Sequence, residues 1–398
     1  MMGNIDFCAP MKLLNKSYLD QLMDQAEIGA LIVTSKHNIQ YFLGGYRFFF
    51  FGYQDAIGTS RYLPALVYIR NSPENTLYIG NPLEKDEQEL EKFWVNNFDF
   101  SSWSSEQTAR IIADHLSKHG IRNTRVGMEK SFLPLDTAEL LQKCCPNNMF
   151  LDALPLLEEL RAVKSSQELA IIRSASDLVV QSMLTVFGQH SPGSTKAELV
   201  EALRQEEVKR GLTFEYCLIT TGKSLNRSPS NQKWEDGQIL SLDSGGNFRG
   251  YIGDLCRMAV HGRPSQELES ALAQIDCVQK AARKPIKSGV TGDEIYEAAM
   301  SELKVLPLAP HMSFVAHGMG IIPHEAPRLS NKAPVPYSAN YAQRPLRAGM
   351  VLSIETTMPH PKLGFIKLED TIAVTKDGHE AFGDIGRGWN LGRAKVSD

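Results

Sequence analysis

The sequence lacks the features that mark membrane, secreted and nucleic-acid-binding proteins. Its longest apolar runs are too short to cross a bilayer, and residues 1–10 do not show the charged, apolar and small-residue order of a signal peptide. The formal net charge is −4 and no basic cluster occurs, which argues against a nucleic-acid-binding surface. We therefore expect a cytoplasmic protein with no nucleic-acid partner and no membrane association.

Cysteine is scarce and irregularly spaced. The 398 residues include six cysteines and no CxxC spacing, which excludes a disulfide framework and a zinc knuckle. The adjacent Cys144 and Cys145 leave a soft-metal or redox role open, although a half-buried cysteine is the common case. Short repeats and low-complexity tracts are also absent. With 42% hydrophobic and 22% charged residues, the composition is that of an ordinary globular protein.

The length suits two domains, and the character of the sequence changes near residue 155. Before that point, helical and strand patterns alternate. Amphipathic helices are expected at 18–26 and 106–118, and apolar strands at 30–35, 63–70 and 76–80. This alternation predicts an α/β domain over residues 1–158.

Residues 159–398 combine long amphipathic helices with apolar strands. The expected helices are 167–188, 196–209 and 266–286, and the expected strands lie at 217–221, 239–260, 350–358 and 365–375. Helices flanking an antiparallel sheet make an α+β domain. We expect such a domain over residues 159–398.

The segment Ile239–Val260 is predicted to form a β-hairpin with a turn at Ser244–Asn247. Asp243 and Asp254 lie within its apolar runs. Burying an ionised carboxylate costs on the order of several kcal/mol unless a cation or hydrogen-bond donors compensate it. A shared cation explains both acids. A turn-capping role for Asp243 and a surface position for Asp254 explain them equally well on the hairpin alone.

Two further acids and two histidines follow. Glu355 ends an apolar strand and Glu369 interrupts another, so each raises the same burial problem. His317 and His324 lie seven residues apart in a segment rich in glycine and proline, which we expect to be a loop; a satisfied polar role and a ligand role are both open for them. Two divalent cations with one imidazole would remove the repulsion among four carboxylates. The oxygen-rich set favours Mn, Co or Fe(II), with Zn also compatible.

Taken in chain order, these motifs resemble the M24 metallopeptidase family, which has the pita-bread fold. The resemblance rests on Asp243 and Asp254 with ten residues between them, then HGMGxxxHExP, GMVLSIE and KLEDTIAV, and covers about residues 160–398. LRAVKSSQELAIIRSAS at its start is similar to the two-domain branch with a creatinase-type N-terminal domain. The family match implies a dinuclear centre with the ligands Asp243, Asp254, His317, Glu355 and Glu369.

The resemblance also implies an activity. The branch contains Xaa-Pro dipeptidases and aminopeptidases, so we expect cleavage of a small peptide by a metal-bridged hydroxide. Glu355 would take the proton of that hydroxide and pass it to the leaving nitrogen. His324 would donate a hydrogen bond to the developing oxyanion.

The aromatic run Tyr46–Tyr53 is the most apolar irregular segment of the sequence. In two-domain relatives the N-terminal domain stands over the active site of its own or the partner chain, which implies a homodimer in which Phe50 and Arg61 contact the substrate. A buried segment of the N-terminal domain is the alternative for this run.

Two departures from the family pattern affect the expected activity. Asn226 stands where the family's peptidases carry a substrate-contacting histidine, and asparagine cannot donate a proton. Lys367 replaces an arginine two positions before the last ligand, exchanging a bidentate fork for a point charge. Asn226 favours a second reading, an enzyme acting on a small non-peptide molecule, like creatinase, ectoine hydrolase or dimethylsulfoniopropionate lyase. A non-catalytic binding module is a third, disfavoured because five buried ligands are costly without metal.

Overall fold

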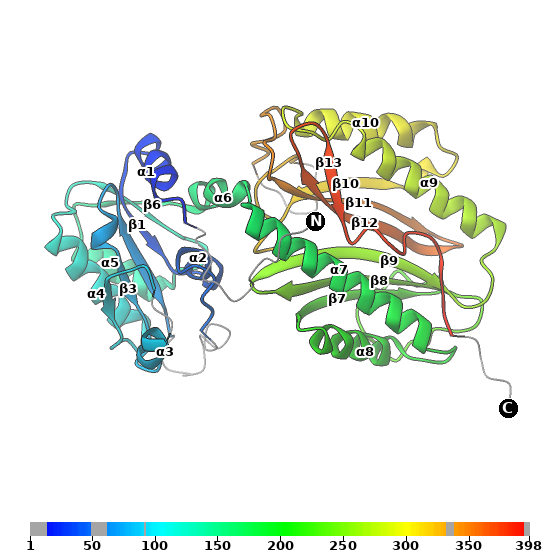
Figure 1. Ribbon diagram of the computed structural model, residues 1–398, viewed down its shortest axis with the longest axis horizontal. Coiled ribbons are helices and arrows are strands. Elements are labelled where there is room, and N and C mark those ends of the chain that lie inside the picture. Colours follow the sequence, from blue (N-terminus) through cyan, green and yellow to red (C-terminus); the bar gives the residue numbers. More distant parts are fainter. Residues whose placement is uncertain (1–13, 49–61, 91–92, 332–337, 394–398) are drawn as a thin grey trace. The chain divides into compact units, whose positions relative to one another are not determined.

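The computed structural model divides into two compact units, residues 1–160 and 161–398. It describes residues 14–48, 62–90, 93–331 and 338–393, and each unit is built around its own β-sheet (Figure 1). The division falls two residues beyond the expected end of the first domain at residue 158.

The first unit contains a mixed six-stranded sheet in the order β4-β3-β2-β1-β5-β6. Strand β1 pairs antiparallel with β2 and parallel with β5. The strands are β1 Ile28–Val33, β2 Ala65–Ile69, β3 Leu77–Ile79, β4 Asn97–Asp99, β5 Arg125–Met128 and β6 Met149–Asp152. The helices are α1 Lys16–Gln25, α2 Lys36–Phe42, α3 Glu84–Leu90, α4 Ser105–Lys118 and α5 Leu135–Cys144, with a 3-10 turn at Pro73–Asn75. Helix α6, Leu154–Ala162, spans the division between the units. The α/β prediction for this unit is confirmed.

The second unit contains an eight-stranded sheet. Six strands follow the order β10-β11-β12-β9-β8-β7, while β13 pairs with β12 and β14 with β9. The strands are β7 Thr213–Thr221, β8 Ile239–Phe248, β9 Tyr251–Val260, β10 Ser313–Gly318, β11 Val351–His360, β12 Gly364–Val374, β13 His379–Phe382 and β14 Asn390–Leu391. All neighbours along the six-strand order are antiparallel, which confirms the α+β prediction.

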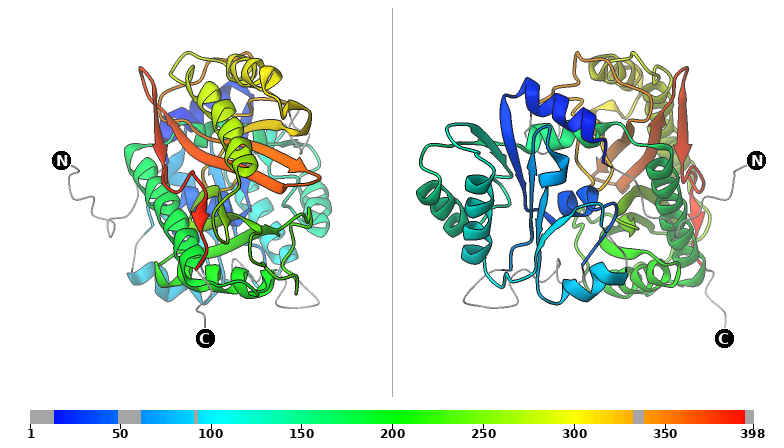
Figure 2. Two further views of the ribbon diagram at one scale, coloured as in Figure 1. Left: turned by 90° about the vertical axis from the view of Figure 1, so that its right-hand side faces the viewer. Right: turned by 60° about the vertical axis from the view of Figure 1, so that its left-hand side comes forward.

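Two pairs of helices cover this sheet. Helices α7 Ser166–Gln189 and α8 Lys196–Lys209 pack against β7, β8 and β9, whereas α9 Gln266–Arg283 and α10 Gly292–Val305 pack against β10, β11 and β12 (Figures 1 and 2). A 3-10 turn at Ala309–His311 follows α10. Among the described helices, only α7 is long and apolar enough to cross a membrane by length and composition, and half of its most apolar window is buried within the protein.

The hairpin turn lies at Arg249–Gly250, so the prediction of a turn at Ser244–Asn247 was wrong. Both turn residues have positive φ values, 51° for Arg249 and 92° for Gly250, as a two-residue hairpin turn requires. The earlier glycines belong to strand β8. A Cβ atom on Gly245 would lie 2.3 Å from the ring of Tyr216, so this glycine permits a close side-chain contact rather than a turn.

Alternation along the strands separates an apolar face from a polar one. On β11, Leu352 and Ile354 belong to the core formed with α9 and α10, whereas Glu355 follows Ile354 and points to the opposite face. On β12, Ile372 belongs to the same core, and Glu369, three positions earlier, points to the opposite face. The helices therefore cover one face of the sheet, and the acids collect on the other.

Candidate metal centre

Five neighbouring strands each carry one of the five predicted metal ligands to the same region of the sheet. In sheet order these are His317 on β10, Glu355 on β11, Glu369 on β12, Asp254 on β9 and Asp243 on β8. Glu355 lies directly opposite Glu369, and the partner of both Glu369 and Asp243 is Cys256. The structure thus brings together all five residues that the sequence pointed to. His317 lies in a strand and not in the expected loop.

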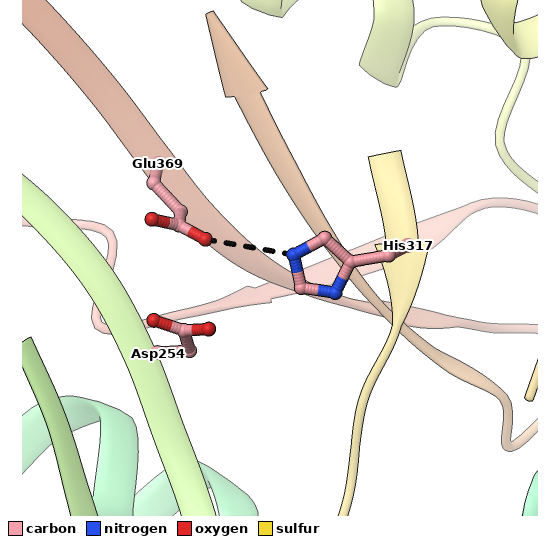
Figure 3. Close-up of side chains that lie close together, drawn as sticks. All are labelled: Asp254, His317 and Glu369. Carbon is pink, nitrogen blue, oxygen red and sulfur yellow. Dashed lines mark ion pairs between the residues drawn. The ribbon is translucent and has the colours of Figure 1, made fainter. Parts of the chain in front are cut away.

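Three of these residues form a compact group. Asp254, His317 and Glu369 offer ligand atoms that all lie within 4.8 Å of one another, and their polar ends face a shared space (Figure 3). His317 Nε2 lies 3.8 Å from Glu369 Oε1. His317 Nδ1 lies 3.3 Å from the carbonyl oxygen of Gly318, which can only accept, so the proton belongs on Nδ1 and Nε2 faces the carboxylates. Two carboxylates and an imidazole nitrogen fit a divalent metal ion.

Two hydroxyl groups orient these carboxylates. The Tyr216 hydroxyl donates to Asp254 Oδ1 at 2.6 Å, and the Ser353 hydroxyl donates to Glu369 Oε1 at 2.7 Å. Partners of this kind fix the direction of metal ligands. Our sequence reasoning missed both. Ser353 had a signal, because it precedes Glu355 by two positions in an apolar strand and so shares its face.

Two cationic side chains also reach the cluster. Lys367 Nζ lies 2.8 Å from Asp243 Oδ2, 2.5 Å from Glu355 Oε2 and 2.8 Å from Glu369 Oε2. Arg227 forms a second ion pair with Asp243, and its guanidinium carbon lies 4.9 Å from the centre of the Phe365 ring. Arg227 was not predicted as a site residue, because the family pattern aligned its neighbour Asn226 with the expected histidine.

Burial and charge move the titration of the cluster in opposite directions. Burial raises the pKa of Asp243 to about 6 against the effect of Lys367, and burial together with Glu369 raises the pKa of Asp254 well above its usual range. Burial also acts to raise the pKa of Glu369, but Lys367 and His317 hold it below its usual range. Burial acts to lower the pKa of His317, and Glu369 and Glu355 nevertheless hold it above its usual value. Binding of a metal ion therefore releases protons from these side chains.

His324 lies directly beside the three-residue group. Its ring stacks on that of His317 with 3.8 Å between the centroids and 17° between the planes. Its Nδ1 atom is buried and makes no hydrogen bond to the described residues. Burial, with His317 adding to it, lowers the pKa of His324 to about 4, so this imidazole is uncharged at neutral pH and retains one N–H donor.

The segment that carries both histidines is held by a buried ion-pair group. Glu325 Oε2 lies 3.3 Å from Arg161 Nη2, and Glu325 Oε1 lies 2.9 Å from Lys164 Nζ. All three side chains are at most 2% exposed. Gly318 permits the same segment to fold back on itself, because a Cβ there would lie 2.3 Å from the backbone nitrogen of Pro327. The position of His324 is therefore fixed by its neighbour in sequence, Glu325.

We expect Glu325→Gln to lower the free energy of unfolding by about 3–5 kcal/mol, because it removes the negative charge that pairs with two buried cations. Urea denaturation of the purified protein measures this. Glu201→Gln is the matched control, because Glu201 forms an exposed ion pair with Arg204 and should contribute little. Equal midpoints for the two variants would show that the Glu325 group is not stabilising.

The three expected substrate contacts have different outcomes. Asn226 is exposed, and its side-chain oxygen accepts from the backbone N–H of Ser228 at 3.0 Å. Its role in substrate binding stays a prediction. Phe50 and Arg61 lie outside the described residues, and their roles stay predictions as well.

Comparisons with known proteins agree with the resemblance seen in the sequence. The sequence model of metallopeptidase family M24 matches residues 170–376, and that of the creatinase/prolidase N-terminal domain matches residues 17–163. These matches confirm the creatinase-type N-terminal domain and the M24 pita-bread domain.

Individual relatives extend the likeness over most of the chain. An Xaa-Pro dipeptidase of Pyrococcus horikoshii is 25% identical over 366 residues, which cover 90% of this chain and 93% of that protein. The solved structure of an Xaa-Pro dipeptidase from Bacillus anthracis has a TM-score of 0.78 at 18% identity and covers 94% of this chain and 98% of its own. An X-Pro aminopeptidase from Thermotoga maritima has a TM-score of 0.75 at 19% identity, with 95% and 99% covered. These two structures show a shared fold.

Proposed function

Because this chain belongs to metallopeptidase family M24, we propose that it is a metal-dependent Xaa-Pro dipeptidase. One observation carries the proposal. The Asp254, His317 and Glu369 group, with His324 stacked beside it, occurs in a chain that aligns over 90% of its length with an Xaa-Pro dipeptidase. The substrate is then a small peptide with proline at its C-terminal position.

The residues around the group have distinct tasks in the proposed hydrolysis. Asp254, His317 and Glu369 would hold a divalent cation, which would supply Lewis-acid chemistry to activate water and polarise the scissile carbonyl. Glu355 accepts the proton of the attacking water at a carboxylate oxygen and delivers it to the proline nitrogen as the peptide bond breaks. His324, uncharged at neutral pH, donates its N–H to the oxyanion.

We propose Mn, Co or Fe(II) as the metal, in preference to Zn, and retain the predicted pair of ions as the fully loaded state. The choice of metal rests on the donor set, in which four of the five side chains are carboxylates.

One assay series tests the function. The metal-free protein is reconstituted separately with Mn, Co, Fe(II) and Zn and given Ala-Pro, the tripeptide Ala-Pro-Gly, and small betaine-like and ureido compounds. Release of proline from Ala-Pro in the presence of metal, with slower cleavage of the tripeptide, supports the proposal. Faster cleavage of the tripeptide would identify an aminopeptidase instead.

A second candidate function is favoured by Asn226. Asparagine cannot act as a proton donor where the family's peptidases carry a histidine. This favours a small non-peptide substrate of a C–N hydrolase or a lyase. Turnover of a betaine-like or ureido compound without release of proline from Ala-Pro would establish this function and overturn the dipeptidase.

We further propose that Phe50 and Arg61 contact the substrate in a cytoplasmic homodimer. Phe50→Ala should raise KM or change substrate preference with little loss of stability. Phe48→Ala is the matched control, because Phe48 is 4% exposed and packs edge-on against Tyr62, so its loss should lower the free energy of unfolding by about 3–5 kcal/mol. Steady-state kinetics and urea denaturation separate the two effects.

The opposite pattern would contradict the proposed contacts. A destabilised Phe50→Ala protein whose folded fraction has unaltered kinetics would identify Phe50 as a core residue. Light scattering after size-exclusion chromatography measures the oligomeric state. A fully active monomer at micromolar concentration would exclude any contribution from a partner chain.

A further inference from the structure

Glu369 faces two separate cation positions. Its Oε1 atom accepts from Ser353 and lies 3.8 Å from His317 Nε2, on the side where Asp254 also lies (Figure 3). Its Oε2 atom lies 2.8 Å from Lys367 Nζ. We call the space among Asp254, His317 and Glu369 the first position. The space that Lys367 Nζ occupies, beside Asp243, Glu355 and Glu369 Oε2, is the second position.

The second position already contains a cation that belongs to the protein. The Lys367 ammonium lies within 2.8 Å of an oxygen of Asp243, Glu355 and Glu369, and the lysine side chain is only 5% exposed. A metal ion needs carboxylate oxygens at about 2.0–2.2 Å. It would have to use the same three oxygens, at a distance from the ammonium where two cations repel strongly. The ammonium and a metal ion therefore exclude each other from this position.

The hydrogen bonding of the ammonium is incomplete. Of its three carboxylate contacts, the one to Asp243 has hydrogen-bond geometry. Glu369 Oε2 is fully buried and makes no hydrogen bond to the described residues, although it lies 2.8 Å from Lys367 Nζ. A buried carboxylate oxygen that makes no hydrogen bond can still coordinate a metal ion. Lys367 therefore occupies the second position, but a metal ion can still displace it.

The charges of the cluster favour a single metal ion. Asp243, Asp254, Glu355 and Glu369 bring four negative charges when ionised. Among the described residues that pair with them, Lys367 and Arg227 supply two positive charges, with His317 as a neutral ligand. One divalent cation supplies the other two, so a single ion neutralises the cluster. A second ion beside the same two side chains would leave an excess of positive charge in a buried site, which is costly.

We propose that Lys367 makes the two metal positions unequal. The first position binds one divalent cation tightly, and the second binds one only when the Lys367 ammonium leaves. The inference deepens the proposed metal-dependent function and rests on it for the presence of metal. It assigns Lys367 as the residue that sets how many metal ions the chain holds at a given metal concentration.

Calorimetric titration of the metal-free protein with Mn²⁺ tests the proposal. The wild-type chain should bind one ion tightly and a second at least about a hundredfold more weakly, because the second must displace a paired ammonium. Lys367→Met removes the charge but keeps a side chain of similar length, so the second affinity should rise at least about tenfold. Electron paramagnetic resonance gives an independent readout, from isolated Mn(II) in the wild type to an exchange-coupled pair in the variant.

Arg227→Met is the matched control. Arg227 also pairs with Asp243, but it is 35% exposed and does not lie among the three carboxylates. Its loss removes as much positive charge but leaves the Lys367 ammonium in the second position, so the second affinity should rise much less than in Lys367→Met. If Arg227→Met gained the second ion as readily as Lys367→Met, total charge and not occupancy would set the stoichiometry, and the proposal would be overturned.

The wild-type protein alone also carries a decisive measurement. Two Mn²⁺ ions bound with equal affinity, or a coupled pair at one equivalent of metal, would overturn the proposal even if Lys367→Met did not fold. None of these readouts depends on peptide cleavage. If the chain binds one ion tightly and releases no proline from Ala-Pro, the dipeptidase function is rejected and the inference about Lys367 stands. If the chain is active and has two equal metal sites, the inference is rejected and the dipeptidase function stands.

Discussion

Glu369→Gln will lose bound metal and catalytic activity together. Glu369 presents one oxygen to His317 and the other to Lys367, so it takes part in both cation positions. Glutamine has the same shape but no negative charge, and its amide nitrogen cannot act as a metal ligand there. We expect Mn²⁺ affinity to fall by more than about a hundredfold, beyond the range for loss of an outer-sphere partner of a metal ligand.

Metal content after dialysis, measured by mass spectrometry, and release of proline from Ala-Pro are the two readouts. Glu207→Gln is the matched control. Burial raises the pKa of Glu207 to about 8, so it is largely protonated at pH 7, and its oxygen accepts from the Ser244 hydroxyl at 2.9 Å. The amide oxygen of glutamine can accept the same bond, and metal and activity should be kept. Normal metal content and turnover in Glu369→Gln would remove Glu369 from the ligand set.

The elements of the second unit followed from periodicity wherever the pattern was long. The expected helix at 196–209 coincides with α8, and the expected strand at 365–375 differs from β12 by one residue at each end. These segments bury one regular face, so the sequence alone carries their signal. The prediction of a turn at Ser244–Asn247 was wrong because a glycine can serve either purpose. Gly245 makes room for the Tyr216 ring, and the sequence alone does not distinguish this from a glycine needed in a turn.

The site residues that could be predicted are the charged residues that stand in apolar segments of the sequence. Asp243, Asp254 and Glu369 each stand in an apolar run, and a buried carboxylate asks for a cation. The cations themselves could not be placed in this way. Lys367 was noticed only as a departure from the family pattern, and Arg227 is an ordinary residue of a polar segment. Both pair with Asp243, which lies in a different segment of the sequence, and no local pattern records such a contact.

His324→Ala should keep bound metal and lose turnover by about two to three orders of magnitude, the range seen when one oxyanion donor is removed. His324 is stacked on His317 but stands outside the three-residue metal group. Its pKa of about 4 leaves it a neutral donor throughout the physiological range, so the loss should not depend on pH between about 6 and 8. The kcat for Ala-Pro and the metal content of the same sample are the two readouts.

Two comparisons make the assignment of His324 specific. His324→Asn retains an N–H donor on a shorter side chain, so it should recover part of the turnover that His324→Ala loses, at equal metal content. A structural role would not distinguish the two variants, because both remove the ring that stacks on His317. If metal occupancy fell in parallel with kcat in both variants, His324 would be a ligand or a support of His317. The oxyanion role requires that turnover and metal content separate.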